Sequence, residues 1–498
     1  MIQDSPEQLD VAVIGSGFGG LCAAIKLREA GLGSFAVLER GDAIGGTWRD
    51  NLYPGCACDV QSHLYSYSFA PNPRWSRMFS SAWEIREYLE RCADEFDVRR
   101  HVRLRSEVTG ARWDAGACRW TVDVNGEEAI AARALVVAKG LLSEPHVPTL
   151  PGLASFGGTT FHSAAWDHDH DLTGERVAVI GTGATAVQFI PEIAPLAGRL
   201  HVFQRSAPWV LPRGDRPITR FERRLFERVP ALQRAYRGAI YAALEGRMLA
   251  FAVEPRLTRA FAAYARWHIE RQIDDPRLRD AVTPDYTIGC KRVLLSNDYY
   301  PALAREDVEL ETARIERVTE RGIVTADGRE VELDTIVFAT GFRPYEVAGL
   351  GIAGRDGVEL AEAWSPTPTA HLGTTVAGFP NLFLIVGPNT GLGHSSMVFM
   401  IESQTRYVID ALRTMRERGL AAVEVRPEVQ AASTARVHEK LATTVWASGC
   451  DSWYLDDRGR NPTIWPTFSF AFRSQTRRFR PEEYVLVEQA PARELVEA

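Results

Sequence analysis

The sequence predicts an α/β fold with two Rossmann-like dinucleotide-binding domains and a helical insertion. Glycine-rich loops at residues 15–20 and 181–186 each follow a short apolar run and precede a helical pattern. Residues 213–283 are instead rich in Arg, Ala, Phe and Tyr at helical spacing. A length of 498 residues exceeds what one hydrophobic core organises, which indicates two or three domains.

The composition is that of an ordinary globular protein, with 45% hydrophobic and 24% charged residues. The net charge is −7, so the chain lacks the overall positive charge typical of nucleic-acid-binding proteins. The start of the chain does not look like a secretory signal, and no apolar stretch is long enough to span a bilayer. Seven scattered cysteines, an odd number, favour reduced thiols over a disulfide framework. We therefore expect a cytoplasmic monomer or homodimer with no nucleic-acid partner and no integral membrane segment.

The sequence predicts no metal site. Cys56 and Cys58 lack the second Cys pair or spaced His pair that would complete a tetrahedral site, so we interpret them as partly buried thiols. His168 and His170 alternate with aspartates on an irregular loop, where they share no fixed face. We interpret that segment as a solvated acidic turn.

The first dinucleotide unit begins with an apolar run at residues 9–14, typical of a buried parallel strand, and continues into a helix over residues 21–30. In the loop between them, Gly15 makes the tight turn, Gly17 lets the backbone approach a pyrophosphate and Gly20 lets the helix pack on the strand. The helix N-terminus would then present unpaired N–H groups to the phosphates.

The second unit repeats this design after an apolar strand at residues 176–180. Its loop consists of Gly181, Thr182 and Gly183, with Ala186 as the small third residue of the motif. The residue at the end of the second strand of each unit indicates whether the bound ribose has free hydroxyls or a 2′-phosphate. Glu39 lies 19 residues after Gly20, where a carboxylate accepts hydrogen bonds from a ribose diol, whereas Arg205 lies 19 residues after Ala186. An arginine there pairs with a 2′-phosphate, so the first site favours FAD and the second favours NADP(H).

The rest of the chain completes the two domains. The further predicted elements are an amphipathic helix over residues 83–96, a β-meander over 102–137, strands near 334–342 and 381–386, and a helix over 396–416. Three prolines suit residues 141–152 to an extended inter-domain connector. These patterns divide the chain into an FAD-binding domain (residues 1–145 and 376–498), an NADP-binding domain (residues 146–212, which include the fingerprint linker described below, and 286–375) and the helical insertion (residues 213–285).

Arginines concentrate at residues 213–228 of the insertion, which raises the alternative of a membrane-surface role. Glu222 and Glu227 intersperse them, so we favour a solvated helix face.

Two longer motifs resemble signatures of the Baeyer–Villiger-type flavin-containing monooxygenases, a group of class B flavoprotein monooxygenases. The residues that match the family's fingerprint F-x-G-x-x-x-H-x-x-x-W-D are Phe156, Gly158, His162, Trp166 and Asp167. The segment from Gly45 to Asp59, with its Gly-Gly-x-Trp and Tyr-Pro-Gly turns, matches a second signature. The resemblance runs from about residue 9 to about residue 470.

The resemblance implies FAD on the first loop and NADPH on the second. It also implies that NADPH reduces the flavin and that O2 then adds at the flavin C4a position to give a peroxide. The peroxide would attack a ketone substrate, with an ester or lactone as product. His162 invites a general-base role, but the migration step needs no protein base, so we favour a structural role for it in the inter-domain connector.

The same resemblance assigns the candidate site residues. Arg292 matches the active-site arginine, whose guanidinium would stabilise the peroxide anion and the oxyanion, and Asp59 matches the carboxylate that positions it. The implied cofactor contacts are Lys291, Arg205 and Ser206 at the NADP 2′-phosphate, Tyr65 beside the flavin, Trp453 near the nicotinamide and substrate, and Trp48, Val108 and Gln188. Lys139 departs from the family, which commonly has a small polar residue there.

Three alternatives stay open at this point. The same peroxide could oxygenate a sulfur or nitrogen atom instead of a ketone. An NADPH oxidase or a disulfide reductase is a second alternative, although Cys56 and Cys58 have the wrong spacing for a C-x-x-C redox site. The third is a non-enzymatic flavoprotein that senses redox state or binds a partner.

Overall fold

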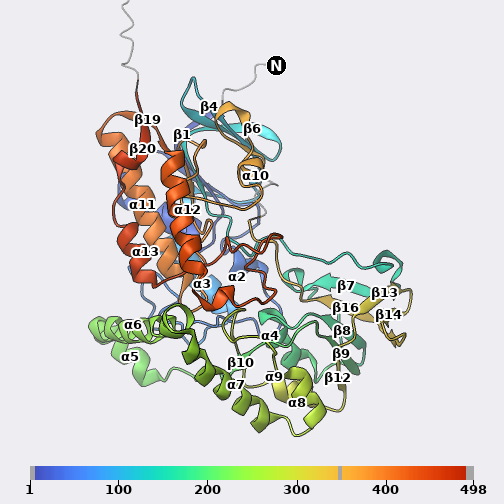
Figure 1. Cartoon of the computed structure of the whole chain (residues 1–498). Helices are drawn as coiled ribbons and strands as arrows, with labels where there is room; N and C mark the ends of the chain where they lie inside the picture. Colours follow the sequence, from blue (N-terminus) through green and yellow to red (C-terminus); the bar gives the residue numbers. More distant parts are fainter. Residues whose placement is uncertain (1–5, 346–349, 490–498) are drawn as a thin grey trace, which may run out of the picture.

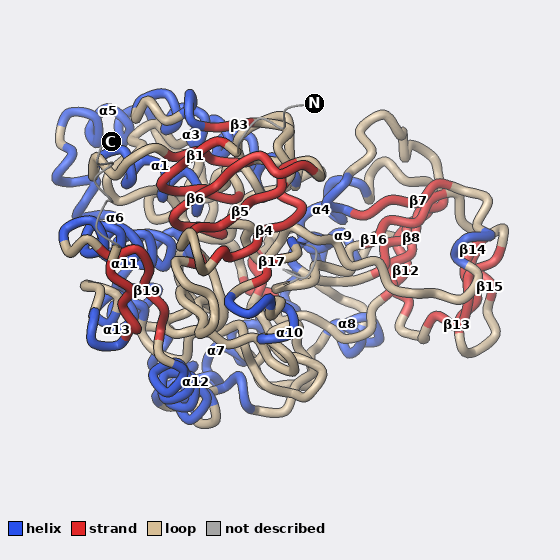
Figure 2. The backbone as a smooth tube through the Cα atoms, turned by 90° about the horizontal axis from the view of Figure 1, so that it is seen from above, coloured by secondary structure: helices blue, strands red, loops and turns tan. Residues whose placement is uncertain are grey.

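The computed structural model describes residues 6–345 and 350–489. Two sheet-centred domains lie side by side, and the helices of the insertion run beneath both of them (Figure 1). Figure 2 shows the two sheets as separate groups of strands, joined by loops and flanked by helices. The predicted fold class, two dinucleotide-binding α/β domains with a helical insertion, matches this architecture.

The first domain is built on an eight-stranded sheet. Seven of its strands run in the order β17-β4-β5-β6-β1-β2-β3, and β18 also pairs with β6. Its strands are β1 (Glu7–Ile14), β2 (Phe35–Leu38), β3 (Val102–Arg103), β4 (Val108–Asp114), β5 (Arg119–Val124), β6 (Glu127–Val137), β17 (Ile352–Ala353) and β18 (Leu382–Leu384). β1 pairs in parallel with β2 and β6, while β4, β5 and β6 form the predicted antiparallel meander.

Helices from both ends of the chain cover this sheet. They are α1 (Phe18–Glu29), α3 (Ala82–Glu95), α11 (Met397–Glu417), α12 (Pro427–Leu441) and α13 (Ser469–Gln475), and the antiparallel strand pair β19 (Leu420–Val425) and β20 (Tyr484–Glu488) lies beside them. α1 packs directly on α11, and Leu21 and Ile25 share a buried cluster with Val408 and Leu412. Residues almost 400 positions apart therefore form one core.

The second domain has a fully parallel sheet in the order β12-β9-β8-β16-β7. Its elements are β7 (Thr159–His162), β8 (Arg176–Ile180), α4 (Ala184–Ile193), β9 (Arg199–Phe203), α9 (Tyr299–Leu303), β12 (Val308–Glu311) and β16 (Thr335–Phe338). A smaller antiparallel sheet of β13 (Ile315–Thr319), β14 (Gly322–Thr325) and β15 (Glu330–Glu332) lies at the far end of this domain (Figure 2).

The insertion leaves and rejoins the second domain at one place, because the short strands β10 (Val210–Leu211) and β11 (Leu294–Leu295) pair with each other. Between them lie α5 (Arg220–Arg228), α6 (Pro230–Glu245), a π-helical turn (Leu249–Val253), α7 (Thr258–Gln272) and α8 (Pro276–Val282). The remaining short helices are α2 (Thr47–Asp50) and α10 (Leu360–Ala363). Among the described residues, no helix combines the length and the apolar character needed to cross a membrane.

Candidate active site

The first glycine loop leaves almost no room for side chains. Gly15 has a φ of +96°, and a Cβ atom on Gly20 would lie 1.8 Å from the carbonyl oxygen of Gly15. Gly17 faces Gly46 of the second signature segment. A Cβ atom built on Gly46 would lie 2.9 Å from the Cα atom of Gly17. Two glycine segments therefore face each other at the start of α1, which suits the close approach of a pyrophosphate.

Glu39 supplies a fixed carboxylate beside this loop. It accepts hydrogen bonds from the Ser16 amide at 2.9 Å and the Ser16 hydroxyl at 2.7 Å, from the Gly41 amide at 2.8 Å, and from Arg49 at 2.5 Å. Burial raises the pKa of the Glu39 carboxyl, but the hydrogen bonds from Arg49 and Ser16 outweigh it and hold the pKa below its usual range. The carboxylate is therefore ionised and oriented to accept from a ribose.

Aromatic side chains form one wall near the N-terminus of α1. The indole of Trp48 donates to the hydroxyl of Tyr65 at 3.2 Å, and Tyr65 packs edge-on against Phe18 with ring centroids 5.1 Å apart. Val108, by contrast, opens β4 opposite Val124, and its side chain is buried in the core of the sheet. A contact from Val108 to a cofactor would therefore come from its main chain.

The two glycines of the second loop are constrained differently: backbone packing excludes a side chain at Gly181 but not at Gly183. Gly181 has a φ of +112°, and a Cβ atom there would lie 2.5 Å from the carbonyl oxygen of Ala339, so the fold itself excludes a side chain. A Cβ atom on Gly183 would meet no atom of the described residues within 4 Å. Because packing does not require this glycine, an approaching ligand gives a reason for it. Ala186 is fully buried where α4 begins.

The predicted 2′-phosphate site consists of Arg205 and Ser206, which follow β9, and of Lys291. Lys291 donates to the hydroxyl of Ser206 at 3.0 Å, and Thr182 donates to the Ser206 carbonyl at 3.2 Å. Arg205 is 86% exposed and lies 3.4 Å from the carboxylate of Asp451. The pKa of Lys291 is lowered, mainly by burial. The charge of Asp451 raises this pKa, and the charge of Arg205 lowers it further. Two neighbouring cations of this kind attract a doubly charged anion.

The centre of the site is a bidentate ion pair between residues 233 positions apart in the sequence. The Arg292 guanidinium donates to both carboxylate oxygens of Asp59, with Nε–Oδ2 at 2.9 Å and Nη2–Oδ1 at 2.6 Å. The charge of Asp59 raises the pKa of Arg292 above its ordinary value. Burial raises the pKa of Asp59, but Arg292 outweighs it and holds the Asp59 pKa below its usual range. Both groups are thus charged, and the guanidinium is fixed in one orientation.

Two further side chains around this pair were missed by the sequence-based assignment. Arg213 donates to the Cys58 carbonyl at 3.0 Å, and its charge lowers the pKa of Asp59. Tyr454 is buried, and its hydroxyl has no hydrogen-bond partner among the described residues. Burial raises the pKa of Tyr454 to about 12, with the charge of Arg292 opposing. An arginine in the insertion and a tyrosine beside Trp453 carry no motif that would have identified them.

The expectation that all cysteines are reduced is wrong for one pair. Cys290 and Cys450 form a disulfide with Cα atoms 6.3 Å apart, while Cys22, Cys56, Cys58, Cys92 and Cys118 are free. The disulfide joins the segment of Lys291 and Arg292 to the segment of Asp451 and Trp453. An odd cysteine count was a poor guide because it carries no information on which residues meet in space. The Trp453 ring remains 44% exposed and leans on Tyr454, with ring centroids 4.7 Å apart.

Gln188, on α4, connects the two domains. Its amide oxygen accepts from the Tyr53 hydroxyl at 2.9 Å and the Ala57 amide at 3.3 Å, and its amide nitrogen donates to the Ala57 carbonyl at 2.9 Å. These bonds occupy the side chain of Gln188, and its predicted contact with a cofactor stays a prediction. What the structure shows directly is a link between the second signature segment and the second domain.

The fingerprint lies at the edge of the second domain. A Cβ atom on Gly158 would lie 2.2 Å from the Asp334 carbonyl oxygen, which excludes any side chain at the start of β7. His162 closes β7 and accepts from the Ala164 amide at 3.1 Å, and burial lowers its pKa. Phe156 packs in the core between the two sheets of this domain, Trp166 packs edge-on against Phe189 at 5.1 Å, and Asp167 accepts from the Asp169 amide at 3.1 Å. These contacts order the connector.

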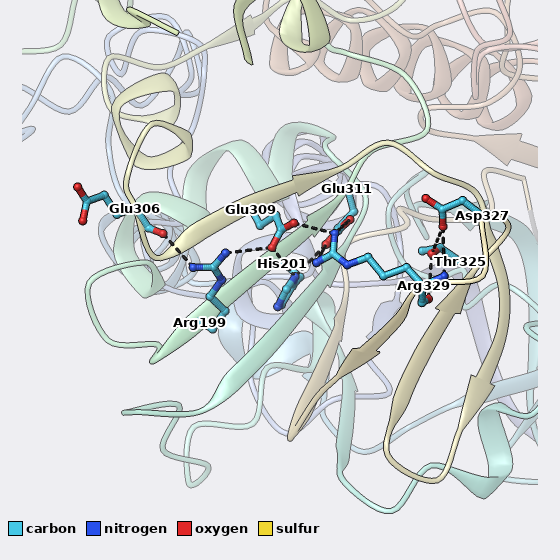
Figure 3. Close-up of polar contacts among 8 residues, drawn as sticks. All are labelled: Arg199, His201, Glu306, Glu309, Glu311, Thr325, Asp327 and Arg329. Atoms are coloured by element: carbon cyan, nitrogen blue, oxygen red, sulfur yellow. Dashed lines mark hydrogen bonds and ion pairs between the residues drawn. The ribbon is translucent and has the colours of Figure 1, made fainter. Parts of the chain in front are cut away.

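One histidine and carboxylate cluster lies elsewhere in the second domain, at the edge strand β12 (Figure 3). His201, Glu309 and Glu311 bring potential metal ligands within 4.8 Å of one another. Arg329 lies 2.7 Å from Glu309 and 3.2 Å from Glu311, and Arg199 lies 3.0 Å from Glu309. The two arginines neutralise the two carboxylates, so we interpret the cluster as an ion-pair network that ties β9, β12 and the β14–β15 turn together.

The fold agrees with the comparisons with known proteins. A sequence model of the flavin-binding monooxygenase-like family matches residues 8–346. The chain belongs to this family. The matched region contains both glycine loops, the fingerprint, Asp59 and Arg292, so the motifs on which the resemblance rested are the ones within the family match.

Two relatives of this flavin-binding monooxygenase are named Baeyer–Villiger monooxygenase. One from Pseudomonas aeruginosa is 50% identical over 96% of this chain and 91% of its own length. One from Streptomyces coelicolor is 49% identical over 98% of this chain and 94% of its own length. A FAD-binding monooxygenase of Aspergillus niger is 37% identical over 96% of this chain and 81% of its own.

Solved structures of similar enzymes share the whole architecture. A Rhodococcus cyclohexanone monooxygenase bound to NADP+ is 31% identical, with a TM-score of 0.88 over 97% of this chain and 100% of that one. A complex of OTEMO with FAD and NADP is 29% identical, with a TM-score of 0.86 over 97% and 100% of the two chains. The predicted enzyme class, a Baeyer–Villiger-type monooxygenase that uses FAD and NADPH, is therefore confirmed.

Proposed function

We propose that this monooxygenase uses O2 to oxidise a ketone to an ester or lactone at the Arg292–Asp59 pair. The observation that supports this assignment of the site is the bidentate ion pair, which fixes the orientation of the Arg292 guanidinium. When bound, FAD and NADPH supply the electrons and the activation of O2. Arg292 then stabilises negative charge on oxygen as the carbonyl is attacked, and Asp59 holds the guanidinium in place.

The other candidate residues hold the cofactors in this proposal. Glu39 accepts from the adenosine ribose of FAD, and the facing glycine segments admit its pyrophosphate. Arg205, Lys291 and Ser206 bind the 2′-phosphate of NADPH. We assign His162 a structural role, because its ring nitrogen is used to order the turn that follows β7.

A ketone and a thioether of the same size test the reaction. We expect NADPH consumption with the ketone, matched by formation of an ester or lactone identified by mass spectrometry. Oxidation of the thioether alone would contradict the proposal, and so would NADPH consumption that yields only hydrogen peroxide with every ketone tried.

Substitution of Arg205 by alanine should raise the KM for NADPH by about 10-fold or more, because a charge-assisted hydrogen bond to the 2′-phosphate is lost. Its 86% exposure limits the effect, since solvent screens the interaction. The KM for NADH should stay within about 2-fold, because NADH lacks that phosphate. Equal losses with the two cofactors would show that Arg205 does not read the phosphate.

The proposal keeps the predicted cytoplasmic location and the predicted monomer or homodimer. Cell fractionation and sedimentation velocity measurements test these two points.

A further inference from the structure

A basic side chain close to the Arg292–Asp59 pair has no use in the reaction proposed above. Arg247 lies between the end of α6 and the π-helical turn Leu249–Val253. Its main chain is satisfied, with its N–H bonded to Leu244 and its carbonyl accepting from Phe251, both at 3.1 Å. The side chain is partly buried, yet among the described residues its guanidinium has no hydrogen bond, ion pair or ring contact.

Arg237, on α6 just before this segment, is an arginine whose hydrogen-bond donors are paired. Arg237 donates to the His63 carbonyl at 2.8 Å, and to the Leu64 carbonyl and the Ser66 hydroxyl at 3.1 Å. Buried arginines are normally paired in this way, because an uncompensated charge away from water is costly. Arg247 has no such partner among the described residues, and its partly exposed guanidinium is open to a ligand.

The nearest acidic residue in the sequence is not available to Arg247. Glu245 is buried and lies 3.0 Å from His394 Nε2, and it accepts from the Ser469 amide at 2.9 Å and the Ser469 hydroxyl at 2.6 Å. These bonds hold the Glu245 carboxylate against His394 and Ser469, in the C-terminal part of the chain. Among the described residues, no carboxylate forms an ion pair with Arg247.

The segment of Arg247 belongs to the wall of the site. A Cβ atom on Gly289, three residues before Arg292, would lie 2.9 Å from the Phe251 ring. Phe251 also contacts Trp446, with ring centroids 6.2 Å apart, and shares a buried cluster with Tyr454. Burial lowers the pKa of Arg247 while the charge of Asp59 raises it, so the guanidinium lies within electrostatic reach of the ion pair.

The anionic groups of the cofactors already have other partners. Their pyrophosphates have the two glycine loops, the 2′-phosphate has Arg205 and Lys291, and Asp59 neutralises Arg292. Of the two other arginines near the ion pair, Arg213 is bonded to the Cys58 carbonyl, whereas Arg247 has no hydrogen-bond partner among the described residues. Its charge matches one additional negative charge.

We propose that Arg247 binds a carboxylate group of the substrate, so that the ketones this enzyme prefers are oxo acids. This inference rests on the proposed ketone oxidation. The planar guanidinium offers a pair of N–H donors that fits a carboxylate, and a single negative charge balances the single cation.

The test compares 4-oxocyclohexanecarboxylate with its methyl ester, using the FAD-loaded enzyme and NADPH. We expect kcat/KM to be at least about 10-fold higher for the acid, mainly through KM. In Arg247→Met, kcat/KM for the acid should fall by about 10- to 100-fold, and the loss for the ester should be at least about 10-fold smaller. Arg247→Lys should recover a fraction of the loss, whereas Arg234→Met, at an exposed position of α6, should behave like the original enzyme.

A binding measurement separates this inference from the proposed function. Cyclohexanecarboxylate should bind the FAD-loaded enzyme by calorimetry, and should bind Arg247→Met at least about 10-fold more weakly. If neither ketone is oxidised, the proposed function fails, and the calorimetry alone decides the role of Arg247. Equal kcat/KM for the acid and the ester in the original enzyme would overturn the inference. A loss of FAD affinity or a changed flavin absorbance in Arg247→Met would also overturn it, by assigning Arg247 to the cofactor.

Discussion

Arg292→Ala should lower the rate of ester formation by about 100- to 1,000-fold while FAD stays bound. The expected size is that of removing one preorganised donor from a developing oxyanion. FAD retention is expected because Arg292 bonds to Asp59 and lies outside the first glycine loop. The measurement is product formation under saturating NADPH, with the flavin content determined from its absorbance. Ester formation at the original rate would remove Arg292 from the proposed chemistry.

A double variant distinguishes the chemical role of Arg292 from its structural one. Arg292→Ala alone leaves the Asp59 carboxylate without its partner, which costs about 3–5 kcal/mol for a buried pair and less here because both side chains are partly exposed. Arg292→Ala combined with Asp59→Ala should recover most of the lost thermal stability, since the unpaired charge is gone. It should not recover ester formation. Recovery of both properties would mean that the single variant had failed through misfolding.

Gly20→Ala should prevent FAD binding and lower the free energy of unfolding by at least about 3 kcal/mol. The added methyl group would lie 1.8 Å from the main-chain oxygen of Gly15, and main chain cannot move aside as a flexible side chain can. α1 would have to shift away from β1, which would open the loop that receives the pyrophosphate. Thermal unfolding and flavin content measure the two effects.

The matched control is Gly238→Ala on the exposed side of α6. A Cβ atom at Gly238 meets no atom of the described residues within 4 Å, and alanine is the better helix former. We expect unchanged FAD content and a gain of about 0.5–1 kcal/mol in stability. An equal loss in both variants would show that the clash at Gly20 is not the cause.

The local design of the fold could be predicted because each element depends on nearby residues. The turn at Gly15, the strands on either side of it and the contrast between Glu39 and Arg205 all follow from spacing within about 40 residues. The ends of elements were less certain. The helix expected from residue 21 already begins at Phe18, because Gly17 is the N-cap residue and the glycine loop is shorter than the pattern suggested.

What could not be predicted depends on residues far apart in the sequence. The Cys290–Cys450 disulfide spans 160 positions, and its partners are chosen by the packing of the insertion against the C-terminal segment. The Glu245–His394 pair and the unpaired state of Arg247 among the described residues arise in the same way. Spacing rules describe single elements, and these contacts form only when several elements pack together. The Arg292–Asp59 pair is farther apart still, at 233 positions, and only the family resemblance suggested it.

The bonds of Gln188 to Tyr53 and Ala57 determine how the two domains can move. Any rocking of the second domain that preserves these bonds must turn about a pivot at α4. Points near a pivot move little, so the loop of Gly181 and Gly183, at the start of the same helix, would keep its distance from the first domain. The three-stranded sheet β13–β15, at the far end, would sweep the longest arc (Figure 2). The geometry thus allows a large swing of the outer surface with little change at the loop proposed to receive the pyrophosphate of NADPH.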